Sequence, residues 1–318
     1  MVVRRIVIRS AACALSAVVL LASPPPVAAD SKQRVVVKYL PQSAAQTPTR
    51  KYASANPNNV ELTAAGVLNI KSATALVVDL DDGQTIYAKN TQSITPIASI
   101  TKLMTAMVVL DAGLPLEETI TIARADLNFG KRSNSRLGVG TGLTRRDMLR
   151  VALMSSENRA AASLARAYPG GAEAFIAAMN RKAVELGMWN TRFADATGLS
   201  SENVSTAEDL VKMVKSAYEY SLIREFTTAP AHEVETATGR NLKFRNSNGL
   251  VKNPAWEIGL SKTGYISEAG RCLVLQARIA ARPVVIVLLD SWGKYTRIGD
   301  ANRIKKWIES HTGRKPVG

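Results

Sequence analysis

Segments with the pattern of β-strands lie towards both ends of this chain, and the segments between them have the pattern of helices. The backbone N–H and C=O groups of a strand need hydrogen-bond partners on neighbouring strands. The simplest arrangement therefore brings the strands from both ends of the chain into one sheet. We therefore predict an α+β fold, in which an antiparallel five-stranded sheet is built from both chain ends around an inserted helical lobe. The expected strands are residues 73–80, 84–89, 257–263, 271–280 and 284–290, with turns at 81–83 and 281–283.

Capping sequences and apolar periodicity indicate the helices. Thr144 and Asp147 form a variant capping box, and Ser205 with Glu208 forms a full one, so a helix should follow each box. Residues 99–111 are apolar nearly all round, which is typical of a helix buried inside a domain. The expected helices are 99–111, 145–153, 159–168, 172–186 with Gly187 at its C-terminal end, a helix from the second box to about 218, and 302–310.

The first 29 residues have the features of a secretory signal peptide. Three arginines lie before residue 10, residues 11–22 are apolar, and small residues precede position 30. These features together predict export with cleavage after Ala29. Residues 30–65 are rich in Ser, Pro, Asn and Gln and are predicted to be a flexible arm or linker. Residues 66–312 would then form the globular domain and residues 313–318 a tail.

The charge and the counts of cysteine and histidine restrict the function classes. Lys and Arg number 41 against 26 Asp and Glu, so the formal net charge is +15. An exported basic protein meets the cell wall or anionic lipid rather than nucleic acid, although a solvated basic face explains the charge equally well. Two cysteines and two histidines are too few for a disulfide scaffold or a four-thiolate zinc site, and we expect no metal and no cofactor. No apolar run reaches the roughly 18 residues that a stable membrane span needs.

Ser99 and Lys102 form an S-x-x-K element at the start of a predicted helix. The i, i+3 spacing places the hydroxyl and the amine on one face of that helix. A serine is a poor nucleophile until a base takes its proton. A buried lysine can be that base, because burial favours the neutral amine and lowers its pKa. Taken alone, however, such an element is expected by chance in a chain of this length.

Two further short motifs follow. Ser156-Glu157-Asn158 begins a predicted helix of small residues, where the serine could relay a proton and the amide could hold Lys102, or the serine could simply be a helix N-cap. Lys262-Thr263-Gly264 lies on a predicted strand. Its Lys and Thr can bind a carboxylate and its Gly admits an extended peptide, whereas the simpler interpretation of Lys262 is a solvated lysine on an edge strand.

The three motifs together, combined with the export signal, resemble those of the low-molecular-mass penicillin-binding proteins. The resemblance is strongest to the penicillin-binding protein 7 type, the D-alanyl-D-alanine endopeptidases of the Gram-negative periplasm. It extends over about residues 65–312 and includes residues 155–171, 187–191 and 197–199, and Lys262–Tyr265. It implies a β-lactamase/transpeptidase-like fold and a periplasmic serine peptidase. Such an enzyme would cleave D-alanyl–meso-diaminopimelate crosslinks in peptidoglycan and would be inhibited covalently by β-lactam antibiotics.

The resemblance also implies roles for individual residues. Ser99 would attack the D-Ala carbonyl and Lys102 would act as the general base, although the base is disputed in this superfamily. Ser156 and Asn158 would complete the proton network. Lys262 and Thr263 would bind the substrate carboxylate beside Gly264. The backbone N–H groups of Ser99 and Tyr265 would form the oxyanion hole.

Other functions remain open at this point. A class A β-lactamase needs a Glu in an E-x-x-L-N pattern after the second motif, and residues 189–199 lack it, so we expect penicillin to inhibit. A carboxypeptidase acting on monomeric stem peptides is the closer alternative, although the short stretch after Gly264 favours the endopeptidase branch. A non-catalytic wall-binding protein would need a decayed site. A Ser-His-Asp hydrolase is unsupported, because His232 lies in a polar segment without a nucleophile elbow.

Overall fold

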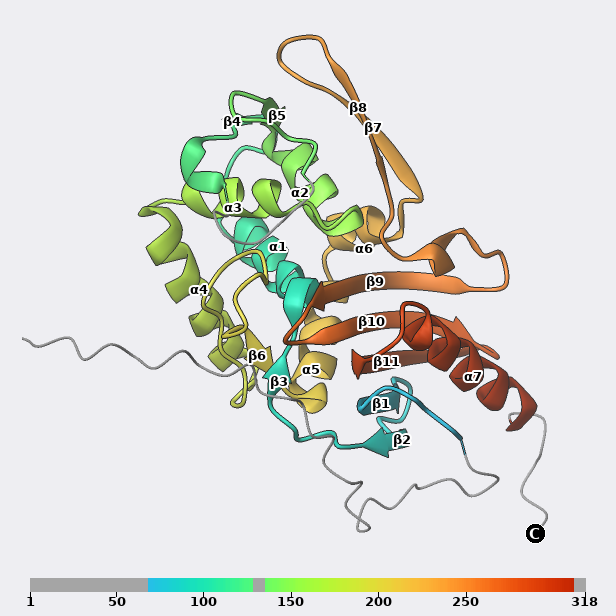
Figure 1. Cartoon of the computed structure of the whole chain (residues 1–318). Helices are drawn as coiled ribbons and strands as arrows, with labels where there is room; N and C mark the ends of the chain where they lie inside the picture. Colours follow the sequence, from blue (N-terminus) through green and yellow to red (C-terminus); the bar gives the residue numbers. More distant parts are fainter. Residues whose placement is uncertain (1–67, 128–134, 312–318) are drawn as a thin grey trace, which may run out of the picture. The chain divides into compact units, whose positions relative to one another are not determined.

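A computed structural model describes residues 68–127 and 135–311 of the protein. The expected signal peptide, the arm at 30–65 and the tail at 313–318 lie outside the described residues. The sheet is five-stranded and antiparallel, with the strand order β2-β1-β11-β10-β9 (Figure 1). Its strands are β1 (Thr74–Asp79), β2 (Thr85–Lys89), β9 (Glu257–Ile266), β10 (Gly270–Ile279) and β11 (Arg282–Ser291). Strand β1 pairs with β11, so the predicted sheet made from both ends of the chain is confirmed.

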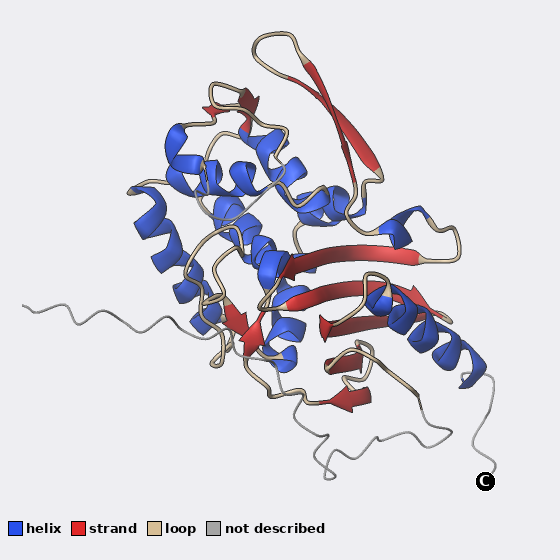
Figure 2. Cartoon of the chain, viewed as in Figure 1, coloured by secondary structure: helices blue, strands red, loops and turns tan. Residues whose placement is uncertain are grey.

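The chain between β2 and β9 contains a lobe of helices, drawn in blue in Figure 2. The helices are η1 (Ala98–Thr101), α1 (Lys102–Asp111), η2 (Arg124–Asp126), α2 (Arg145–Met154), α3 (Asn158–Arg166), α4 (Gly171–Glu185), α5 (Ala207–Tyr218), α6 (Ser221–Thr228) and η3 (Gly249–Lys252). Short strands accompany them: β3 (Thr95–Pro96) pairs with β6 (Val204–Ser205), β4 (Thr119–Thr121) with β5 (Gly142–Thr144), and β7 (Ala231–Glu235) with β8 (Asn241–Arg245). The last helix is α7 (Thr296–His311).

The sheet separates two apolar cores. One core contains α1, α5 and the side chains of β10 and β11 that face the lobe, such as Val274 and Val285. The other lies between the opposite sheet face and α7, through Leu275, Ile304 and Ile308. Every residue of α1 from Lys102 to Val109 is buried, which confirms the prediction of a helix inside the domain. The motif residues on this helix are therefore held by packing on all sides.

The five predicted strands are the five strands of the main sheet, but the last turn was misplaced. The turn consists of Ala280 and Ala281, with φ of 50° and 67°, and β11 starts at Arg282. Two alanines in left-handed conformation leave no signal in the sequence, because Gly or Asn usually marks such a turn. Pro283 is accepted because it lies at the beginning of its strand. Strand β9 also continues to Ile266, past the predicted end at residue 263.

Each predicted helix is present, but several of them begin or end at other residues than predicted. Thr144 caps α2 as predicted, accepting a hydrogen bond from Asp147 N at 3.0 Å. The predicted box at Ser205 is wrong by one residue: Thr206 caps α5, because Ser205 belongs to β6 and its Oγ lies 2.7 Å from Thr191 Oγ1. Helix α7 begins six residues before the predicted position, at Thr296. Within the described ranges, no helix combines the length and apolarity needed to cross a membrane.

Candidate active site

The S-x-x-K element lies where a 3-10 helix becomes an α-helix. Ser99 belongs to η1 and Lys102 begins α1, so the predicted single helix from residue 99 starts as a tighter turn. The i, i+3 pair meets as expected, with Lys102 Nζ 2.9 Å from Ser99 Oγ. Ala98, directly before the serine, has φ of 48°, a conformation that an L-residue adopts only under constraint from its surroundings.

Lys102 is buried among hydrogen-bond acceptors. Its side chain is 1% exposed, and Nζ lies 2.7 Å from Asn158 Oδ1 and 2.5 Å from the carbonyl oxygen of Thr197. Burial lowers the pKa of the Lys102 amine from 10.5 to about 7, against a smaller opposing effect of the Asp195 and Glu157 carboxylates. The neutral amine, which is the protonation state that a general base needs, is therefore far more populated at neutral pH than in an exposed lysine.

The loop after Phe193 supplies the carbonyl that faces Lys102, and Asp195 fixes its shape. The Asp195 carboxylate accepts hydrogen bonds from the N–H groups of Thr197, Gly198 and Ser200 at 2.6–2.7 Å. A Cβ on Gly198 would lie 2.0 Å from the carbonyl oxygen of Ala98, so only glycine allows this loop to approach η1 so closely. Asp195 was not singled out from the sequence, because an aspartate in a polar loop has no distinctive pattern.

The second motif reaches the site from the start of α3. The prediction that Ser156 begins the helix is wrong. Ser156 has φ of 63°, and Glu157 is the N-cap, whose side chain accepts a hydrogen bond from Arg159 N. The simple N-cap interpretation of Ser156 is therefore wrong. The turn directs the Ser156 hydroxyl to Lys262 Nζ at 2.9 Å, while Asn158 contacts Lys102.

The third motif lies on β9, at the edge of the sheet. Lys262 is only 1% exposed, so the interpretation as a solvated lysine is wrong. Burial is the main cause that lowers the pKa of its amine well below the usual value, and the charges of Lys102 and Arg297 add to it. Thr263 Oγ1 donates to Ser247 Oγ at 2.8 Å. The structure thus brings all three motifs together around two neighbouring amines.

Gly264 allows β9 to touch η1. A Cβ at this position would lie 3.0 Å from Ser99 N and 3.0 Å from the carbonyl oxygen of Ile97. These are backbone atoms that cannot rotate away, so a side chain would push the strand and the serine apart. Tyr265 follows directly, with its side chain 56% exposed. The predicted residues of the oxyanion hole, Ser99 and Tyr265, therefore lie on two backbones in close contact.

Arg297, in the first turn of α7, was not found from the sequence. Burial and the neighbouring Arg271 lower the pKa of its guanidinium, and its charge acts on Lys262. Its buried Nε and Nη1 have no hydrogen-bond partner in the described part of the chain. Guanidinium donors left over beside a buried lysine favour binding of an anion. No sequence signal marked this residue, because one arginine near a helix start is ordinary.

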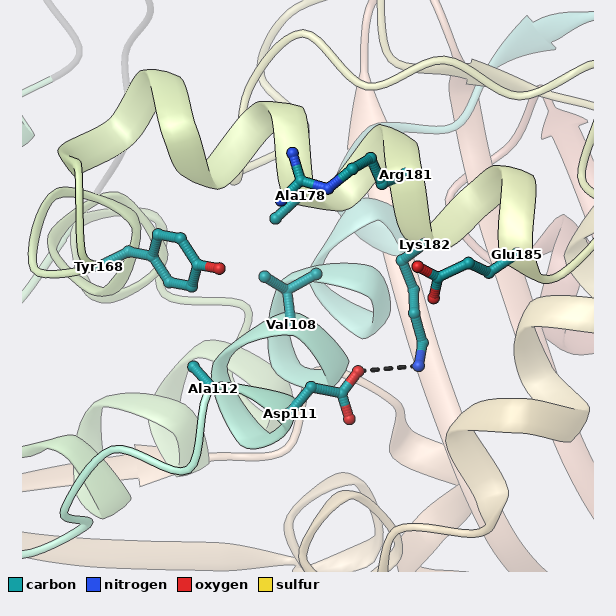
Figure 3. A pocket seen from close by; sticks show the side chains of 8 residues that line it. All are labelled: Val108, Asp111, Ala112, Tyr168, Ala178, Arg181, Lys182 and Glu185. Atoms are coloured by element: carbon teal, nitrogen blue, oxygen red, sulfur yellow. Dashed lines mark ion pairs between the residues drawn. The ribbon is translucent and has the colours of Figure 1, made fainter.

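A hollow at the other end of α1 is separate from these motifs. It lies between α1 and α4, and Figure 3 shows Lys182 reaching across to Asp111, with the two charged atoms 2.8 Å apart. The ten residues of α1 span about 15 Å, which separates this hollow from Lys102. Its residues are Val108, Asp111, Ala112, Tyr168, Ala178, Arg181, Lys182 and Glu185.

His232 contacts α2 rather than the three motifs. His232 lies on β7 with Nε2 3.1 Å from Asp147 Oδ1 on α2, and so belongs to the contact between the hairpin and the lobe. Among residues 68–127 and 135–311, no group of His, Cys, Asp and Glu has the geometry to hold a metal ion.

Comparison with known proteins identifies the family. The family model described as D-alanyl-D-alanine carboxypeptidase, peptidase family S11, matches residues 60–293. The chain belongs to this family. It is therefore a serine hydrolase, and the resemblance seen in the motifs is confirmed.

Relatives of known name agree with this assignment. The D-alanyl-D-alanine endopeptidase of Pseudomonas aeruginosa is 50% identical over 76% of this chain and 78% of its own length. The D-alanyl-D-alanine endopeptidase of Escherichia coli is 46% identical over 87% of this chain and 86% of its own length. The crystal structure of the Streptomyces K15 DD-transpeptidase has a TM-score of 0.70 and 30% identity, covering 75% of this chain and 97% of that one. The predicted transpeptidase-like fold is confirmed.

Proposed function

We propose that the protein is a DD-endopeptidase that cleaves D-alanyl–meso-diaminopimelate crosslinks in peptidoglycan through an acyl-enzyme. The single observation that carries the proposal is the contact of 2.9 Å between Ser99 Oγ and the buried Lys102 Nζ. The two similar proteins named endopeptidase, at 50% and 46% identity, support the choice of substrate. A D-Ala–diaminopimelate bond resembles D-Ala-D-Ala locally, because the amine is on a D-configured carbon that carries a carboxylate.

In the acylation step, Ser99 Oγ attacks the D-Ala carbonyl carbon and the neutral Lys102 amine accepts its proton. The developing oxyanion accepts hydrogen bonds from the N–H groups of Ser99 and Tyr265. When the C–N bond breaks, the leaving amine takes a proton that Lys102 returns through the Ser156 hydroxyl. Asn158 keeps Lys102 in place at 2.7 Å. Water then attacks the Ser99 ester, and the reverse proton transfers release the shortened peptide.

The third motif would bind the carboxylate next to the bond that is cleaved. Lys262 supplies a buried amine and Thr263 a hydroxyl on the same strand, and Arg297 adds unpartnered donors. Charge-assisted hydrogen bonds of this kind are roughly twice as strong as neutral ones. Penicillin carries a carboxylate beside its reactive amide, so we expect it to acylate Ser99 as a covalent inhibitor.

The N-terminal 29 residues would direct export, and the enzyme would act in the periplasm on crosslinked peptidoglycan. This part of the proposal depends on the sequence alone. N-terminal sequencing of protein recovered from the periplasm tests it, with Asp30 as the expected first residue. Recovery of the full chain from the cytoplasm would contradict it.

The activity is tested with a mixture of crosslinked muropeptide dimers and monomeric pentapeptides, followed by mass spectrometry. We expect dimers to be converted to monomers while pentapeptides persist, and S99A to leave both unchanged. Some similar proteins are named carboxypeptidases, including one from Bacillus subtilis at 30% identity. Removal of one D-Ala from pentapeptides with intact dimers would identify the protein as a carboxypeptidase and refute the proposal.

A further inference from the structure

Exposed aromatic side chains gather at one end of the sheet. Within the described ranges, four aromatic residues are among the exposed large apolar side chains, and three of them are Tyr265, Trp292 and Tyr295. Trp292 is 83% exposed and Tyr295 is 69% exposed. The fourth is Trp189, in the loop after α4. Large aromatic groups held in water mark a binding surface more often than scattered aliphatic side chains do.

This aromatic surface, defined by Tyr265, Trp292 and Tyr295, is continuous with the active site. Tyr265 follows Gly264 on β9, and across the sheet it pairs with Arg271, which pairs with Ser291 at the end of β11. Figure 1 shows the arrowheads of β9 and β11 at the end of the sheet that lies nearest to the start of α1. Strands are about 4.8 Å apart, so two strand spacings place Ser291, the residue before Trp292, roughly 10 Å from Tyr265.

The loop that carries Trp292 and Tyr295 is a defined turn. The N–H of Gly293 donates to Thr296 Oγ1 at 3.1 Å, and the N–H of Thr296 donates to the carbonyl oxygen of Gly293 at 3.2 Å. Lys294 Nζ lies 5.3 Å from the Tyr295 ring centroid, and the Arg271 guanidinium lies 4.5 Å from that of Tyr265. Because the turn is fixed before binding, less entropy is lost when a ligand is bound. The two cations place positive charge beside the rings.

The length of the substrate limits what can reach this surface. A peptide spans at most about 3.5 Å per residue, so a stem peptide of four residues held at Ser99 keeps its attached sugar within roughly 14 Å of the serine. Tyr265 lies inside that distance, because it follows Gly264, whose backbone touches that of Ser99. Sugar rings present flat faces of C–H groups that stack on Trp and Tyr rings, and the nearby cations suit the carboxylates of the peptide that joins sugar to crosslink.

We propose that Tyr265, Trp292 and Tyr295 form a binding surface for the glycan strand of peptidoglycan. The proposal rests on the proposed function, because the stem peptide in the active site is what brings the glycan within reach. The glycan would run past the ends of β9 and β11 and position the crosslink at Ser99. This surface would allow the enzyme to prefer intact wall over free peptides.

The binding test uses glycan strands from which the peptides have been removed, immobilised on a surface. Tyr265 contributes its backbone to the active site, so only the loop is changed: W292A, Y295A and the double variant are compared with wild type and with W189A. We expect W189A to bind like wild type and the double variant to bind about tenfold more weakly, which corresponds to about 1.4 kcal/mol. Equal binding by the double variant and wild type would overturn the proposal.

The activity test separates this proposal from the proposed function. Cleavage is measured on intact sacculi and on crosslinked peptide dimers without sugars, and acylation is measured with a fluorescent penicillin. The double variant should show a raised KM on sacculi, with unchanged peptide cleavage and unchanged acylation. An equal loss on sugar-free dimers would assign the surface to the second stem peptide and refute glycan binding. If wild type cleaves neither substrate, the proposed function fails, while the immobilised glycan still decides the binding proposal.

Discussion

Replacing Lys102 by Met should change how the stability of the protein depends on pH. The amine has a folded-state pKa of about 7 against 10.5 when exposed, and it is fully buried. In the unfolded chain the amine stays protonated up to about pH 10, whereas the folded protein loses this proton above pH 7. The unfolded state therefore binds more protons in this window, and wild-type stability rises with pH.

The size of the effect follows from the two pKa values. The lowered pKa of the buried amine destabilises the folded state by about 4 kcal/mol at pH 7 and by about 2 kcal/mol at pH 9. Below pH 6 this destabilisation is nearly constant. Met has a similar volume and no charge, so K102M lacks this contribution at every pH. K102M also lacks the contacts that Lys102 makes with Ser99, Asn158 and Thr197. Their loss costs the same free energy at each pH, because none of these three groups titrates in this range. The Lys102 charge is one cause of the lowered pKa of Lys262, so K102M also changes the titration of Lys262. The same pair is therefore also compared in a K262M background, which removes that titration.

The assay is urea unfolding of wild type and K102M at pH 5.5, 7 and 9, with acylation by a fluorescent penicillin as the activity readout. We expect the stability of wild type relative to K102M to rise by about 2 kcal/mol from pH 7 to pH 9, and by clearly less from pH 5.5 to pH 7. K102M should not be acylated. A stability difference that stays constant from pH 7 to 9 would show that Lys102 is not an amine with a lowered pKa.

Three further changes test the site. S99A should abolish acylation and keep the urea midpoint of wild type; acylation of S99A would assign the nucleophile elsewhere. K262A should slow the reaction of substrates that carry a carboxylate but not that of an uncharged ester, and an equal loss on both would refute carboxylate binding. G264A should slow acylation about tenfold or more by separating β9 from Ser99, since a Cβ there meets backbone atoms at 3.0 Å. G249A is its control because a Cβ at Gly249 meets no atom within 4 Å, and equal rates in both variants would contradict the steric argument.

Local patterns predicted the elements that pack with ordinary geometry. The apolar runs of α1, β10 and β11 were recognisable because nearly all residues of these elements are buried. The hairpin of β7 and β8 was missed, since Val234 is the only buried residue of β7 and charged residues flank it. The turn at Ala280 and Ala281 was missed because its conformation is imposed by the strands it joins, and alanine carries no preference for it.

The motifs of the candidate site were found, but the parts that hold them in place were not. Ser99, Ser156 and Lys262 have short signatures with a chemical reason for each residue type. Asp195 shapes its own loop, whose carbonyl at Thr197 meets Lys102 from 95 residues away, and the charge of Arg297 acts on the distant Lys262. Single residues of this kind have no local pattern, so sequence reasoning could identify the chemistry but not the framework around it.

The position of β11 in the sheet bears on the stage of folding at which the active site is assembled. It is the middle strand of the sheet, yet it is the last sheet strand in the chain, and Thr74 of β1 pairs with Leu289 near its end. Pairing between such distant segments is slow and must wait until both are available. The strands that precede Ser99 and the strand that carries Lys262 share one sheet only through β11. We therefore expect activity to arise late in folding, after β11 has joined the strands before Ser99 to the strand that carries Lys262.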